Sequence, residues 1–153
     1  MRLFIDGDAL PNIIKSIIFK SIERLKIETI VISNKTISIG SSKNITYKVV
    51  SKGIDEADNQ IVDLITPGDI VITSDIPLAD RVVEKGAYAI SHRGVLYDKN
   101  SIKSHLAMRN LMEQIRDSGE ITKGPAPFGK RDIHNFATTF NNLLAKIYKK
   151  SSK

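Results

Sequence analysis

Residues 3 to 8 read Leu-Phe-Ile-Asp-Gly-Asp, an apolar run that stops at two aspartates separated by one glycine. The apolar run predicts a short buried strand over residues 2–6. Two carboxylates at the end of such a strand repel each other unless solvent, a shared proton or a cation offsets their charge. The stretch therefore predicts a buried strand with a candidate site at its carboxyl end.

Outward from this stretch, strands alternate with helices over the first hundred residues. The predicted strands span residues 2–6, 29–33, 45–50, 69–74 and 88–91, and the predicted helices span 11–25, 55–65, 76–85, 101–117 and 132–149. Such alternation favours right-handed βαβ units, and continuous Val/Ile strands favour a sheet covered on both faces. We expect one domain, residues 1–153, that folds as a three-layer α/β/α sandwich. Its mostly parallel sheet should have about five strands, with the strand at 45–50 near an edge and helices at the C-terminus.

Composition excludes several classes of protein. The chain has 153 residues, of which 41% are hydrophobic and 26% charged, the usual mix for a globular domain. It contains no cysteine, which rules out disulfides, thiolate nucleophiles and cysteine-ligated zinc. The first apolar run is too short for a signal peptide, and no apolar stretch reaches the roughly 18 residues of a spanning helix. We therefore expect a cytoplasmic protein without a membrane segment.

The positive charge is concentrated near the C-terminus. Residues 1–119 hold 16 Lys/Arg and 15 Asp/Glu, whereas residues 120–153 hold 7 and 2, so that +5 of the net +6 lies in the last segment. A basic C-terminal helical segment from about residue 120 suggests a polyanionic partner, of which nucleic acid is the commonest. A solvated terminus that promotes solubility is the alternative.

Several carboxylates are predicted to meet at one edge of the sheet. Asp6 and Asp8 follow the first strand, Asp75 follows the fourth, and Asp55 and Asp58 open the helix after the third. The carboxyl ends of parallel strands share one edge, where ligands of open α/β sheets bind. An all-oxygen site of this kind suits Mg²⁺ or Mn²⁺.

Each of these residues also has a structural alternative. Asp55 and Asp75 are good helix N-caps, and a capping carboxylate still keeps one oxygen free. Asp80, five residues after Asp75, is assigned to the surface of its helix, Asp69 to a turn and Asp63 to a helix surface. Asp6 and Asp8 flank Gly7, and helix capping explains only one of these two carboxylates.

Three segments resemble one known family. They are Asp6-Gly7-Asp8-Ala9-Leu10-Pro11, the stretch from Gly53 to Val62, and the stretch Gly68-Asp-Ile-Val-Ile-Thr-Ser-Asp-Ile-Pro-Leu-Ala79. Further along the chain, the matching positions are Arg93-Gly94, Met108-Arg109, Arg116, Gly119, Gly124-Pro125 and Phe136. The chain is identified by these motifs as similar to the YaiI/YqxD family of uncharacterised bacterial proteins. It departs from the family at Leu10, where the family motif has cysteine.

The resemblance implies a fold and a candidate chemistry. The family looks like a relative of PIN-domain nucleases, in which acidic residues at the strand ends bind Mg²⁺ or Mn²⁺. Thr73-Ser74-Asp75 is similar to their Thr-x-Asp motif, and Asp6 is similar to their first aspartate. Asp6, Asp58 and Asp75 would then be metal ligands whose carboxylates converge, Asp8 a further ligand or base, and Asp55 an additional ligand.

Phosphodiester hydrolysis fits this donor set, because a carboxylate-held metal both activates water and neutralises phosphate charge. Basic residues could surround the pocket and contact nucleic acid, most plausibly RNA. The candidates are Arg93, Arg109, Arg116, Lys123, Lys130 and Arg131. A solvated helix face is the alternative for the stripe that contains Arg109 and Arg116. A homodimer is compatible with the sequence but is not indicated by it.

Two other functions stay open. A haloacid-dehalogenase-like phosphatase would use Asp6 as nucleophile, Asp8 as acid/base and Ser33 as the hydroxyl group. Against it, Gly68-Asp69 precedes a strand rather than ending one, and no inserted cap segment is evident. A non-catalytic RNA-binding module is the other alternative. Dinucleotide-binding and P-loop motifs are missing from the sequence.

Overall fold

A computed structural model of the chain describes residues 1–51, 53, 55–119 and 127–151. The elements in chain order are β1 (Leu3–Asp6), α1 (Asn12–Leu25), β2 (Thr29–Ser33), β3 (Ile45–Val49), α2 (Glu56–Leu64), β4 (Ile70–Ile72), α3 (Ile76–Glu84), β5 (Tyr88–Ile90), β6 (Leu96–Tyr97), α4 (Ser101–Asp117) and α5 (Lys130–Ser151). The expected helices and strands are all present, with ends that differ by up to two residues. Strand β6 was not expected.

The described strands form one six-stranded sheet in the order β3-β2-β1-β4-β5-β6. Strands β1 to β5 are mutually parallel, and only β6 runs antiparallel, against β5. The mostly parallel sheet is therefore confirmed, with six strands in place of about five. Strand β3 lies at an edge, as its alternating pattern predicted, and only its first residue is buried.

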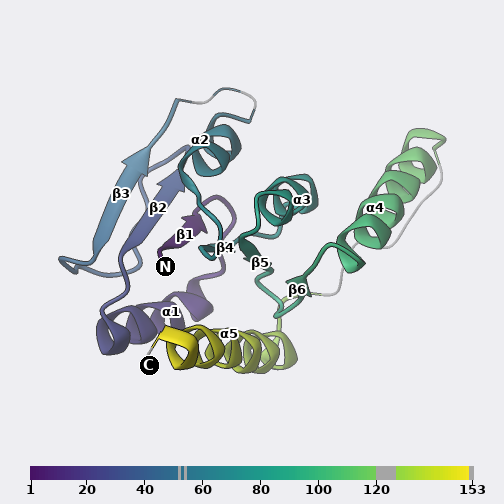
Figure 1. Cartoon of the computed structure of the whole chain (residues 1–153). Helices are drawn as coiled ribbons and strands as arrows, with labels where there is room; N and C mark the ends of the chain where they lie inside the picture. Colours follow the sequence, from purple (N-terminus) through teal and green to yellow (C-terminus); the bar gives the residue numbers. More distant parts are fainter. Residues whose placement is uncertain (52, 54, 120–126, 152–153) are drawn as a thin grey trace.

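Helices cover both faces of the sheet (Figure 1). Helices α1 and α5 pack on one face, where Ile14, Ile18, Phe136 and Phe140 bury against alternate residues of the central strands. Helices α2, α3 and the start of α4 cover the other face, where Phe4 lies in a second apolar cluster. Side chains of a strand alternate between faces, so each central strand contributes to both clusters. This is the predicted three-layer α/β/α sandwich.

The strand order creates a reversal point beside β1. From β1 the chain proceeds outward through β2 and β3, then returns to add β4 and β5 on the other side of β1. Loops after β1 and β4 consequently diverge and leave room at the carboxyl ends of these two strands, where open α/β sheets bind ligands. None of the helices in the described parts of the chain combines the length and apolarity needed to cross a bilayer.

Candidate functional site

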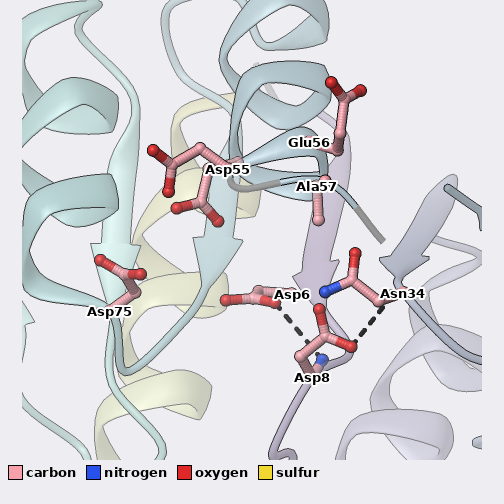
Figure 2. A pocket seen from close by; sticks show the side chains of 9 residues that line it. Asp6, Asp8, Asn34, Asp55, Glu56, Ala57 and Asp75 are labelled. Carbon is pink, nitrogen blue, oxygen red and sulfur yellow. Dashed lines mark hydrogen bonds between the residues drawn. The ribbon is translucent and has the colours of Figure 1, made fainter. Parts of the chain in front are cut away.

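A pocket lies at the carboxyl ends of β1 and β4, at the reversal point of the strand order (Figure 2). Its lining consists of Asp6, Asp8, Asn34, Gly53, Asp55, Glu56, Ala57, Asp58 and Asp75. All five aspartates predicted as metal ligands thus line one pocket, although they come from separate segments of the chain. Asp80 does not line it, because its carboxylate is held by Lys103 at 2.9 Å, on the side where α3 meets α4.

Asp6 is the most buried of these aspartates, with 8% of its surface exposed at the end of β1. One carboxylate oxygen accepts a hydrogen bond from the Thr73 hydroxyl at 2.9 Å, and the other accepts from the backbone N–H of Asp8 at 3.4 Å. Thr73 Oγ1 in turn accepts from the backbone N–H of Asp75 at 3.0 Å. The Thr73 hydroxyl therefore links the ends of β1 and β4, and this contact positions Asp6 beside the segment that carries Asp75.

Asp75 caps helix α3, as the sequence predicted. Its Oδ1 accepts from the backbone N–H of Leu78 at 3.1 Å, and Pro77 lies in the first turn of the helix. A single capping bond leaves the second carboxylate oxygen for the pocket. The cap thus orients the Asp75 side chain and leaves its second carboxylate oxygen able to accept a hydrogen bond.

Asp55 and Asp58 enter the pocket from the start of α2, as predicted. Asp55 occupies the N-cap position with a left-handed backbone (φ 62°), and its side chain makes no capping hydrogen bond. The predicted N-cap position of Asp55 is therefore confirmed, but its exposed carboxylate is not used as a capping acceptor. Asp58 lies in the first turn and is partly buried.

Four residues of the pocket lining were not predicted as site residues, namely Asn34, Gly53, Glu56 and Ala57, and two of them, Asn34 and Glu56, have polar side chains. Glu56 follows Asp55, and in Figure 2 its carboxylate points away from Asp6 and Asp75. Asn34 follows β2, and its backbone N–H donates to Asp8 Oδ1 at 3.0 Å. The buried Oδ1 of Asn34 has no hydrogen-bond partner among the described residues. Position after a buried strand was the only signal that could have identified it.

Crowding shifts the titration of two of the aspartates. Burial, followed by the charges of Asp8 and Asp75, raises the pKa of Asp6 to about 6, against the lowering effect of its hydrogen bond from Thr73. Burial and then the charges of Asp75, Asp6 and Asp55 raise the pKa of Asp58 to about 7. Both carboxyl groups therefore lose their protons only at a higher pH than usual, because burial and the neighbouring negative charges disfavour the carboxylate form.

The raised pKa values predict that the metal-free protein loses stability as pH rises. A carboxyl whose pKa is higher in the folded state stabilises the fold below its unfolded pKa, and this stabilisation is lost as pH rises from about 4 to about 7. Asp58→Asn should therefore be more stable than wild type at pH 8 in EDTA, and not at pH 4. Because Asp58 is only partly buried and solvent screens its charge, we expect a gain of about 1 kcal/mol.

Thermal melts at pH 4, 6 and 8 measure this effect, and Asp63→Asn is the matched control. Asp63 lies on the same helix and is exposed outside the pocket, so its replacement should change the melting temperature little at any pH. A pH-independent loss of stability in Asp58→Asn would mean that its position in the first turn of α2 matters more than repulsion.

The pocket has the donor chemistry for a hard divalent cation, but its side chains are not placed as ligands. Carboxylate and amide oxygens are the donors that Mg²⁺ and Mn²⁺ prefer, and the raised pKa values and the unpartnered Asn34 Oδ1 are consistent with a missing positive charge. No three His, Asp or Glu side chains among the described residues are grouped so that they could hold a metal ion. The expected convergence of Asp6, Asp58 and Asp75 is thus limited to a shared pocket, and binding would require rotation of side chains.

The predicted nucleic-acid-binding residues lie apart from this pocket. Arg93 forms an ion pair with Asp132 at 2.8 Å and lies over the Phe128 ring, which helps to fix the start of α5. Arg109 pairs with Glu113 on α4 at 3.0 Å. The exposed residues Arg116, Lys130 and Arg131 lie on α4 and α5, and Lys123 falls outside the described residues. None of the described basic residues lines the pocket.

Comparisons with known proteins cover nearly the whole chain. Residues 4–146 match the sequence model of a family described as "Uncharacterized BCR, YaiI/YqxD family". A UPF0178 protein of Sulfurimonas denitrificans is 62% identical over 146 residues, which is 95% of this chain and 97% of the relative. UPF0178 proteins of a Sulfurovum species and a Nitratiruptor species are 59% and 56% identical, over 95% and 98% of this chain and 99% of each relative. No solved structure matches the chain.

Proposed function

From the premise that this chain belongs to the uncharacterized YaiI/YqxD family, we propose that it is a PIN-like nuclease that depends on Mg²⁺ or Mn²⁺ and cleaves phosphodiester bonds, with RNA as the favoured substrate. The observation that supports this most directly is the pocket itself. Five aspartates from three separate segments line one pocket at the reversal point of a parallel sheet. Neither family name nor relatives indicate a reaction, so the proposal rests on the site.

A divalent cation, when bound, would supply positive charge for the phosphate oxygens and lower the pKa of a water molecule. Asp6, Asp58 and Asp75, which line the pocket, would hold the cation, and Asp55 would add a carboxylate from the exposed start of α2. The bond from Thr73 and the α3 cap restrict the orientations of Asp6 and Asp75, which reduces the entropy lost on binding. Asp8, held by Asn34 N–H through one oxygen, has a second oxygen that can accept a proton from water.

The substrate's phosphates would also need positive charge outside the acidic pocket. Arg116, Lys130 and Arg131 are exposed and can contact a nucleic-acid backbone, and such contacts carry little sequence preference. Arg93 and Arg109 are engaged in ion pairs, so their contribution would require exchange of a carboxylate for a phosphate. Binding through these residues is therefore expected to weaken with added salt.

The phosphatase alternative is less well supported by the contacts of Ser33. A phosphatase of that type needs the Ser33 hydroxyl beside the phosphate, whereas this hydroxyl donates to the carbonyl of Lys35 and Ser33 does not line the pocket. Asp6 and Asp8 do lie at the end of β1, as that mechanism requires. The nuclease is consequently the better-supported function.

We expect the purified chain to cleave labelled single-stranded RNA in Mn²⁺ or Mg²⁺ and to lose this activity in EDTA. A simple phosphomonoester, p-nitrophenyl phosphate, and single-stranded DNA should be assayed in parallel. Release of phosphate without RNA cleavage would favour the phosphatase. Retained RNA binding without either reaction would favour the non-catalytic module and would contradict the proposed function.

A further inference from the structure

Helices α2 and α3 lie side by side on one face of the sheet, and both begin at the aspartate pocket (Figure 1). Asp58 in the first turn of α2 and Asp75 at the N-cap of α3 line that pocket. Further along the boundary between the two helices, Arg81 in the last turn of α3 and Lys85 at its C-cap reach across to α2. These two residues, here called the α3 cation pair, were not among the basic residues singled out from the sequence.

Neutral acceptors hold the α3 cation pair against α2. Arg81 Nη1 donates to Asn59 Oδ1 at 3.0 Å, and Asn59 directly follows the pocket residue Asp58. Lys85 Nζ donates to the carbonyl oxygen of Val62 at 2.6 Å. Both cations are exposed, and neither forms an ion pair with a carboxylate of the described residues. Their positive charge is therefore available to an anion from solution.

The side of α3 that faces α4 shows how the fold accommodates two like charges at the same spacing. Asp80 and Glu84 also lie four residues apart, and Lys103 of α4 bridges them, at 2.9 Å from Asp80 and 3.4 Å from Glu84. Like charges four residues apart repel each other across one helical turn. Lys103 offsets this repulsion for the acidic pair, whereas no carboxylate of the described residues does so for the α3 cation pair. An anion bound between the two cations would have that effect.

The helix dipole explains only part of this arrangement. Cations are favoured near the C-terminus of a helix, which is where Arg81 and Lys85 lie. That attraction acts along the helix axis, so it does not select the side of α3 that faces α2. The hydrogen bonds to Asn59 and Val62 hold both charges at the boundary that begins at the pocket.

We propose that the α3 cation pair binds two successive phosphates of the RNA strand whose scissile phosphate occupies the aspartate pocket. This inference rests on the proposed nuclease function. Arg81 and Lys85 are one helical turn apart, or about 6 Å along the axis, which is comparable to the distance between successive phosphates of an extended single strand. Arg81 lies six residues after Asp75, or about 9 Å along α3. The strand would thus leave the pocket along the α2–α3 boundary, held by contacts that track its backbone and read no sequence.

The salt dependence of RNA binding measures these contacts. We suggest fluorescence anisotropy of a labelled oligouridylate in EDTA, which prevents metal-dependent cleavage. Each phosphate contact on a single strand contributes about 0.7 to the slope of log affinity against log salt, so Arg81→Gln/Lys85→Gln should reduce the slope by about 1.4. The matched control is Lys20→Gln/Arg24→Gln, an exposed pair at the same spacing on α1, which covers the other face of the sheet. It removes the same charge and should leave the slope unchanged.

Cleavage kinetics in Mn²⁺ give a second readout. A contact to phosphates away from the reacting bond is made equally in the ground state and the transition state. Its loss in Arg81→Gln/Lys85→Gln should therefore raise KM about tenfold and leave kcat within about twofold of wild type. Thermal melts should confirm that this variant is folded, since both side chains are exposed. If wild type binds RNA without cleaving it, the proposed function fails, and the salt slopes alone decide whether the α3 cation pair binds phosphates.

Three results would overturn the inference. The first is a wild-type chain that does not bind RNA even at low salt. The second is a slope that is unchanged in Arg81→Gln/Lys85→Gln, or that falls equally in Lys20→Gln/Arg24→Gln, which would assign binding to net charge rather than to this boundary. The third is a lower kcat with unchanged KM and salt slope, which would mean that the α3 cation pair acts on the pocket and does not bind the strand.

Discussion

Replacing Asp6 with Asn is expected to lower metal-dependent RNA cleavage about a thousandfold or more, equivalent to about 4 kcal/mol of transition-state stabilisation. Asp6 lies at the reversal point between β1 and β4 and is 92% buried, since only 8% of its surface is exposed. Asn has the same shape but cannot supply the charge that holds a divalent cation. Its amide oxygen can still accept from the Thr73 hydroxyl, so the fold should persist.

The matched control is Asp80→Asn. Asp80 is a carboxylate of the segment after β4, but it pairs with Lys103 outside the pocket, so its loss should leave cleavage within about twofold of wild type. Melting curves in Mg²⁺ and in EDTA should accompany both assays. Asp6→Asn should lose the stabilisation that Mg²⁺ gives to wild type, because binding and folding are linked. Full activity in a correctly folded Asp6→Asn variant would remove the aspartate pocket from the mechanism.

The elements that could be predicted from sequence are those with a strong local pattern. Continuous Val/Ile runs located β2 and β4, and apolar residues at helical spacing located α1 and α5. Strand β6 has only two residues, Leu96 and Tyr97, and so few residues carry no periodicity. It forms because the chain after Gly94 turns back and pairs with β5, which is a tertiary effect.

Ion pairs with distant segments could not be predicted from the local sequence. Asp69 was assigned to a turn, and it directly follows the turn at residues 67–68; it is also buried, where it accepts from the backbone N–H of Arg2 at 2.9 Å and pairs with the Arg2 guanidinium. Asp80 was assigned to a helix surface, and its pairing partner Lys103 lies on a helix that follows much later. The sequence around Asp69 and Asp80 indicates neither the ion pair with Arg2 nor the ion pair with Lys103.

The sequence predicted the sheet edge at which the candidate site lies, but it did not predict the contacts between the site residues. Parallel strands put Asp6 and Asp75 at one edge, and this followed from the pattern alone. Asn34 joins them because β2 lies directly beside β1, so its residues end at the same edge. Polar residues after strands are common, so Asn34 could not be identified as a site residue without knowing that β2 lies beside β1.

The largest effect on stability is expected for Gly94→Ala, which we predict to lower the free energy of unfolding by about 3–5 kcal/mol. Gly94 has a φ of +86°, a conformation that side chains with a Cβ rarely adopt. A Cβ at this position would also lie 2.5 Å from the carbonyl oxygen of Asn135 and 2.7 Å from the backbone nitrogen of Phe136. These are backbone atoms of α5, which cannot rotate away as a side chain could.

Gly119→Ala separates the two causes of this cost. Gly119 has the same φ of +86°, but no atom of the described residues lies within 4 Å of the Cβ position. It should therefore show only the conformational cost, about 1 kcal/mol. The difference between the two variants, measured by urea unfolding, isolates the contact between Gly94 and α5.

The contact matters because α5 completes one layer of the fold. Thr139 donates to the Gly94 carbonyl at 2.8 Å, and Phe136 and Phe140, on the same part of α5, are buried against the sheet. An alanine at position 94 must either push α5 outward, which opens a cavity beside Phe136, or distort the turn after β5. Thr139→Val removes only the hydrogen bond and should cost about 1 kcal/mol. If Gly94→Ala destabilises the protein no more than Gly119→Ala, α5 does not depend on this close approach.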